Sequence, residues 1–136
     1  MSAVYYFGRW GGPGHYLWSP AGHIAEQAVT TPWTLRELDT LCGDPALADV
    51  RGRRSGDPLY WPGDEAHQPQ GVARLYHREG WTALAWWDRS CDTRFGSNSA
   101  FVARGTLTAE ALAQLGATAF PSVWTRVEAA GGLVLP

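Results

Sequence analysis

The sequence predicts an α+β protein: an antiparallel sheet of about five strands, with a short helix in the first half and helices at the C-terminus. Strand-like runs rich in aromatic side chains are separated by short turns that contain glycine, as antiparallel neighbours require. Helical patterns appear near residue 35, where DPALADV at residues 44–50 can add one more turn, and after residue 107. With 136 residues, of which 45% are hydrophobic, and a net charge of -2, the chain suits one folded domain, residues 1–136.

The N-terminal part predicts a hairpin. Residues 3–10, AVYYFGRW, have the aromatic composition of a strand, and the GGPG that follows must interrupt it. Residues 15–22, HYLWSPAG, then form a second short strand that ends in a turn.

A helix begins at residue 35. Thr34 stands at the N-cap with Glu37 three residues later, which is the spacing of a capping box, and Trp33 and Leu38 have the spacing of a hydrophobic staple. The apolar stripe of this helix comprises Leu35, Leu38, Leu41 and Cys42, and Gly43 marks its end.

Residues 49–71 are rich in proline and glycine and show no periodicity, so they predict a long loop. Its RGRR run carries Arg51, Arg53 and Arg54, which are candidates for contact with nucleic acid. The alternative is an ordinary solvated loop.

The strongest hairpin signal follows. Residues 79–80, Glu-Gly, suit a tight turn because glycine tolerates positive φ. In the strand 81–88 both alternating faces are mostly apolar, so we expect this strand to be central and covered on both sides. Residues 99–107, SAFVARGTL, predict the next strand.

The C-terminal part predicts two helices. Thr108 is an N-cap candidate, Glu110 suits the first turn, and Gly116 is expected to end this helix. Pro121 then begins a second helix, which Gly131 and Gly132 end.

The stretch WDRSCDTRFGSNSAF, residues 87–101, is the candidate site. Its arginines suit a phosphate or a carboxylate, and its aspartates suit a metal or an acid–base pair. The alternative, which we favour slightly, is a structural cap in which these side chains satisfy one another and the sheet edge. The candidate binding residues are Asp88, Arg89, Asp92, Arg94 and Asn98, together with Arg51, Arg53 and Arg54 of the preceding loop.

Several function classes lack support. The HExxH, GxSxG, GxGxxG and GK[ST] patterns are absent, and neither Cys42 nor Cys91 belongs to a CxxC pair. We therefore predict no catalytic residue, no metal and no cofactor, we lean away from an enzyme, and we expect both cysteines to be free thiols. No apolar run is long enough to span a bilayer and no secretory signal is evident, so the expected compartment is the cytoplasm.

The basic residues are all arginine, 11 in number, and there are eight tryptophans. A GC-rich coding genome accounts for such a composition, but arginine and tryptophan are also the preferred anchors of protein interfaces. The near-neutral net charge argues against a dedicated non-specific DNA binder.

The segment GWTALAWWDRSCDTRFGSNSAF resembles a motif in small uncharacterised proteins carried by phages and other mobile elements of Gram-negative, GC-rich bacteria. The opening YYFGRWGGPGHYLWSPAG and the later TAFPSVW are similar to segments of the same proteins. The likeness covers about two-thirds of the chain, excludes residues 44–70, and assigns no catalytic residue. It implies the company of counter-defence proteins such as anti-CRISPR inhibitors.

The leading hypothesis is therefore an accessory protein that acts by binding, as a counter-defence inhibitor of a host defence protein or ribonucleoprotein complex. The alternatives are a nucleotide- or nucleic-acid-binding protein and a small hydrolase or transferase with a polar site at residues 88–99. We expect a monomer or a homodimer that does not associate with membranes.

Overall fold

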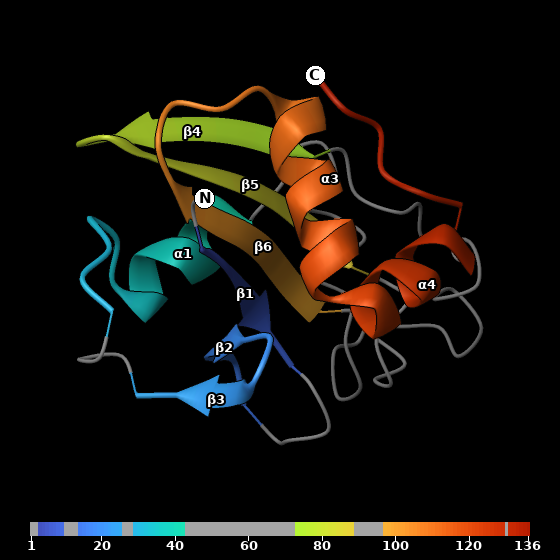
Figure 1. Ribbon diagram of the computed structural model, residues 1–136, viewed down its shortest axis with the longest axis horizontal. Helices are drawn as coiled ribbons and strands as arrows, with labels where there is room; N and C mark the ends of the chain where they lie inside the picture. Colours follow the sequence, from blue (N-terminus) through green and yellow to red (C-terminus); the bar gives the residue numbers. More distant parts are fainter. Residues whose placement is uncertain (1–2, 10–13, 26–28, 43–72, 89–96, 130) are drawn as a thin grey trace, which may run out of the picture.

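The protein is described by a computed structural model that covers residues 3–9, 14–25, 29–42, 73–88, 97–129 and 131–136, with the backbone alone at residues 87, 88 and 97. Within these ranges the fold is α+β, with an open antiparallel sheet and three helices (Figure 1). The elements are β1 (Val4–Gly8), β2 (Tyr16–Ser19), β3 (Gly22–Ile24), α1 (Leu35–Leu41), β4 (Arg74–Arg78), β5 (Trp81–Asp88), β6 (Ser97–Arg104), α3 (Ala109–Ala119) and α4 (Pro121–Ala129).

The sheet has six strands in the order β3-β2-β1-β6-β5-β4, one more than the expected number. The extra strand is β3, because the chain turns after Ser19 and pairs back on β2 through Gly22–Ile24. A strand of three residues is too short to show a period, so sequence patterning missed it. The strand β5 has neighbours on both sides, as expected, but β1 and β6 form the middle pair of the sheet.

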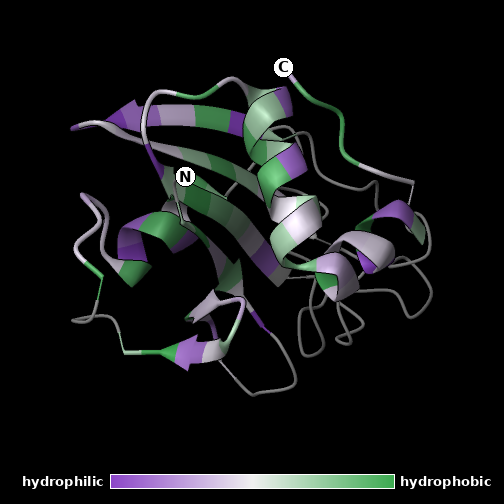
Figure 2. Cartoon of the chain, in the orientation of Figure 1, coloured by the Kyte–Doolittle hydropathy of each residue, from purple (hydrophilic) through white to green (hydrophobic). Residues whose placement is uncertain are grey.

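Both faces of the sheet are covered, which confirms the interpretation of β5. Leu84 and Trp86 belong to the core beneath α3 and α4, whereas Trp81, Ala83 and Ala85 belong to the core on the α1 side. Figure 1 shows α3 lying across β5, β6 and β1, and Figure 2 shows hydrophobic residues along β5 and β6 behind this helix. Because both of its faces are buried, β5 carries apolar residues on both sides and does not show the alternation of apolar and polar residues that is typical of a strand with one face in water.

The helix α1 begins as predicted. The Thr34 hydroxyl accepts a hydrogen bond from the Glu37 backbone N–H at 3.1 Å, and the Glu37 carboxylate accepts one from the Thr34 N–H at 3.2 Å. Trp33 and Leu38 are 4% and 0% exposed and pack in the same core cluster, which confirms the staple. Local sequence thus determines where α1 starts and which side it buries.

The helix α3 is longer than expected. Thr108 caps it as predicted, but the helix runs through Gly116 and ends at Ala119. Gly116 is buried against the ring of Phe101, and a Cβ at this position would overlap that ring. The glycine therefore serves close packing between α3 and β6 instead of helix termination.

Candidate functional site

An arginine, a tryptophan and a second arginine form one row across three adjacent strands on the α1 side of the sheet. Arg78 of β4 lies opposite Trp81 of β5, and Trp81 lies opposite Arg104 of β6. We call these three residues the Arg–Trp row. It stands at the end of the sheet where β4 turns into β5, and both of its arginines are exposed.

Arg78 is held by its surroundings. Its guanidinium donates to the Glu37 carboxylate at 2.8 Å and to the Pro32 carbonyl at 3.3 Å, and it lies 5.6 Å from the centre of the Trp33 ring. The hydrogen bond from Arg78, with the one from the Thr34 backbone, lowers the pKa of Glu37 below its ordinary value. Arg78 is thereby fixed against α1, and its charge is matched within the protein.

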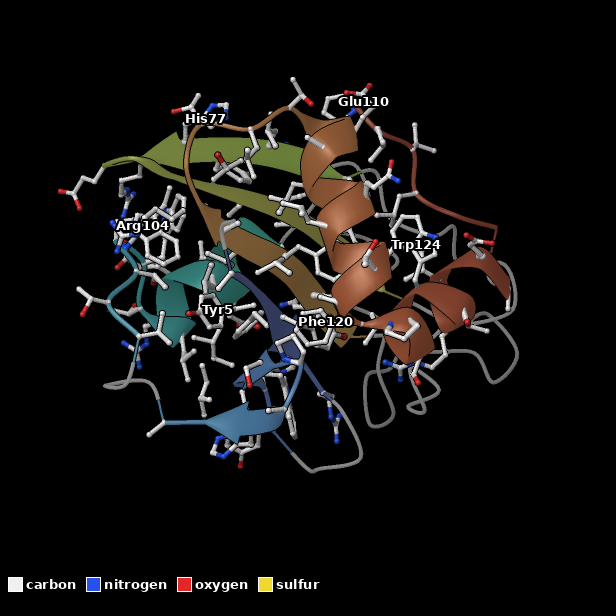
Figure 3. The ribbon with its side chains drawn as sticks, in the orientation of Figure 1. Tyr5, His77, Arg104, Glu110, Phe120 and Trp124 are labelled. Atoms are coloured by element: carbon white, nitrogen blue, oxygen red, sulfur yellow. The ribbon has the colours of Figure 1, made fainter. Side chains whose placement is uncertain are left out.

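Arg104 is held differently. Its guanidinium lies over the Trp81 ring at 4.8 Å from the ring centre, and the centres of the Trp81 and Tyr5 rings are 6.4 Å apart. Among the residues that the structure describes, no carboxylate pairs with Arg104. Figure 3 shows Arg104 at the periphery of the molecule, near α1. The row therefore offers one arginine that is positioned by an aromatic ring but has no matching charge in the described parts of the chain.

A small pocket of about 210 Å³ adjoins Arg104. It lies between the segment that precedes α1 and the β4–β5 turn, and Trp81 and Arg104 form part of its wall. The remaining lining residues are Thr30, Thr31, Pro32 and Glu79. With Glu37 and Glu79 beside Arg78 and Arg104, this surface carries two formal charges of each sign.

A second pocket, of about 430 Å³, lies on the opposite side of the sheet between β4 and the start of α3. Its wall is mostly apolar and includes Leu75, Leu107 and Pro136. Figure 3 shows His77 and Glu110 at this end of the molecule. A ring nitrogen of His77 lies 3.0 Å from the Leu107 carbonyl, so this imidazole already serves as a link between β4 and the segment before α3.

Of the predicted site residues, the structure describes the side chain of Asn98 alone. Its amide nitrogen donates to the Asp39 carboxylate at 2.7 Å and to the Asp39 carbonyl at 3.2 Å, and so ties β6 to α1. Asp88 is the last residue of β5 and pairs with Ser97 through the backbone, but its side chain is outside the described residues. The remaining predicted residues also lie outside them: Arg89, Asp92, Arg94, Arg51, Arg53 and Arg54.

Cys42 is a buried free thiol, as predicted, and Cys91 lies outside the described residues. The Cys42 Sγ is 3.1 Å from both the Leu38 carbonyl and the Ser99 carbonyl, so the thiol links α1 to β6 in the core.

Across the described ranges, His, Cys, Asp and Glu side chains form no group of three that could hold a metal ion. None of the helices there is long and apolar enough to cross a membrane.

Sequence reasoning missed the Arg–Trp row, although two of its three residues could have been paired from the hairpin. A two-residue turn at Glu79-Gly80 places Arg78 opposite Trp81 by hairpin geometry alone. The position of Arg104 could not be predicted, because the sequence pattern of two apolar strands does not specify the register in which β5 and β6 pair.

No family model, curated protein or solved structure matches this chain.

Proposed function

We propose that this protein acts by binding another protein through the Arg–Trp row, and that the binding serves counter-defence against a host defence protein or ribonucleoprotein complex. The observation that carries the binding role is Arg104, an exposed arginine stacked on Trp81 without a matching carboxylate among the described residues. Arginine is one of the residue types enriched in protein–protein hot spots, and Trp81 holds the Arg104 guanidinium in place before a partner binds.

The charge of the surface favours a protein partner over nucleic acid. Affinity for nucleic acid depends on several arginines or lysines that neutralise successive phosphates. Glu37 pairs with Arg78, and Glu79 lines the same pocket as Arg104 without forming an ion pair with it, so the formal charges of this surface sum to zero. The surface therefore lacks the basic excess that a phosphate backbone requires.

The counter-defence role rests on the resemblance of the GWTALAWWDRSCDTRFGSNSAF segment to proteins of mobile elements. That segment spans residues 80–101 and contributes Trp81 with the rest of β5 to the site, while its middle part, residues 89–96, lies outside the described residues. A nucleotide- or nucleic-acid-binding site, or a small hydrolase or transferase site, at residues 88–99 stays the alternative, and the side chains described within that range are those of Asn98 and Ser99.

The test is a phage-restriction assay in a bacterial host that carries an active CRISPR system against the phage. We expect the wild-type protein to restore plaque formation and Arg104→Ala to lose about tenfold or more, the effect of about 1.4 kcal/mol in binding. Arg36→Ala is the matched control, because Arg36 is an exposed arginine of α1 that does not line the pocket.

Thermal melts of the three proteins accompany the assay, so that loss of activity is separated from loss of folding. If the wild-type protein protects the phage against none of the defence systems tested, the counter-defence role is wrong. If Arg104→Ala protects as well as the wild type, the Arg–Trp row is not the binding surface.

A further inference from the structure

The pocket beside Arg104 has the size of a side-chain site. Its volume of about 210 Å³ is below the roughly 300–1,000 Å³ of pockets that enclose drug-sized ligands. A pocket of this volume suits the end of one side chain.

Arg104 lines this pocket, and its guanidinium carbon lies over the Trp81 ring, 4.8 Å from the ring centre. A guanidinium carries five N–H donors in a planar fork. This fork matches the two oxygens of a carboxylate, and the ring restricts the side chain before the ligand arrives.

Glu79 stands in the same pocket wall in an unfavourable backbone conformation. Its φ is 50° and that of Gly80 is 78°, as in a hairpin turn that favours asparagine or glycine at both positions. A glutamate here costs conformational free energy that asparagine would largely avoid. A backbone outlier at a pocket points to a function for the side chain that it carries.

The charge of Glu79 selects among anions. Glu79 is exposed, lines the pocket and forms no ion pair with Arg104 in the described part of the chain, so its carboxylate is available to accept a hydrogen bond from a ligand. At the same distance Glu79 repels a phosphate dianion about twice as strongly as a carboxylate, which offsets the equally enlarged attraction of the dianion to Arg104. A carboxylate ligand that also carries an N–H donor gains the hydrogen bond to Glu79 in addition.

From this pocket we infer that the protein recognises an acidic side chain of its partner, with the carboxylate on Arg104 and an adjacent N–H donor on Glu79, and that it discriminates against phosphate. The inference rests on the protein-binding function proposed above and names the chemistry of the same site. An aspartate or glutamate in an exposed peptide segment supplies both groups, because its backbone amides lie next to the carboxylate.

The experiment is an NMR titration of the full ¹⁵N-labelled protein, observed at the Nε–H signals of Arg104 and Arg36. The probes are N-acetyl-glutamate α-amide, N-acetyl-glutamine α-amide and inorganic phosphate at equal ionic strength. We expect a saturable shift of Arg104 with the glutamate derivative, no saturable shift with the glutamine derivative, and weaker binding of phosphate. Arg36 should show only the gradual drift caused by salt.

Glu79→Asn separates the two parts of the inference. It should raise the melting temperature by about 2–5 °C, because it relieves the turn, and it should bring phosphate binding closer to that of the glutamate derivative. Arg104→Ala should abolish binding of both anions while the fold is retained.

Equal binding of the glutamate and glutamine derivatives overturns the inference, as does wild-type binding of phosphate at least as tight as that of the glutamate derivative. If Glu79→Asn prefers the glutamate derivative over phosphate as strongly as the wild type does, Glu79 does not select between the two anions. If Arg104 binds the glutamate derivative but Arg104→Ala still protects the phage, the proposed function fails and the carboxylate site stands. If Arg104→Ala loses protection of the phage but the wild type binds no carboxylate, the carboxylate site fails and the proposed function stands.

Discussion

Replacing Gly116 by alanine should destabilise the protein, contrary to the rule for glycine inside a helix. In a helix interior this change normally stabilises by about 0.8–1.0 kcal/mol. Here the new methyl group overlaps the Phe101 ring, and overpacking of a core costs roughly 1–3 kcal/mol. The balance is a loss of about 1 kcal/mol, which corresponds to a decrease of about 3–4 °C in the melting temperature for a domain of this size.

The Phe101 ring cannot turn aside cheaply, because other rings surround it. It packs with the rings of Trp86, Tyr6, Phe120 and Trp124, whose centres lie at 5.0, 5.9, 6.2 and 6.3 Å. The assay is chemical denaturation followed by circular dichroism. The matched control is Gln114→Ala, which adds an alanine to the exposed side of the same helix and should be neutral or slightly stabilising. If Gly116→Ala is more stable than the wild type, α3 does not approach β6 as closely as described.

Three further predictions concern the sheet and its contacts with α1. Asn98→Ala should lower stability by about 0.5–1.5 kcal/mol, because the amide then no longer reaches Asp39; a loss of phage protection without this destabilisation would instead favour Asn98 as a binding residue. Glu37 has a folded-state pKa below its ordinary 4.5, so its contribution is present above that pH and is lost as the pH falls through the folded pKa. The stability difference between the wild type and Glu37→Gln, measured by thermal melts, should therefore shrink in acid, and a constant difference from neutral to acid pH would contradict this. Leu84→Asp should prevent folding, because it buries an unpaired charge in the core under α3; a soluble variant with the wild-type melting temperature would disprove the placement of β5.

The candidate site shows how far sequence patterning reaches in this protein. Residues 87–101 stood out because polar and charged side chains gather between two apolar strands. That criterion detects polar residues close together in sequence. The Arg–Trp row joins residues from three strands, and Arg104 appeared only as part of the predicted strand 99–107.

The sequence by itself determined the elements whose stabilising contacts are local. The capping box of Thr34 and Glu37, the turn at Glu79-Gly80 and the two apolar faces of β5 each depend on residues within a few positions of one another. For such contacts the chain has few alternative partners, so composition and spacing suffice.

The tertiary structure alone decided the contacts between residues distant in the chain. The pairing of β6 with β1, the stacking of Arg104 on Trp81 and the fit of Gly116 against Phe101 join segments that have many other partners of compatible polarity. Choosing among them depends on how whole faces pack at once, because close packing in the core tolerates few of the arrangements that the hydrophobic pattern permits. The sheet face that collects Arg78, Trp81 and Arg104 exists only after that choice is made.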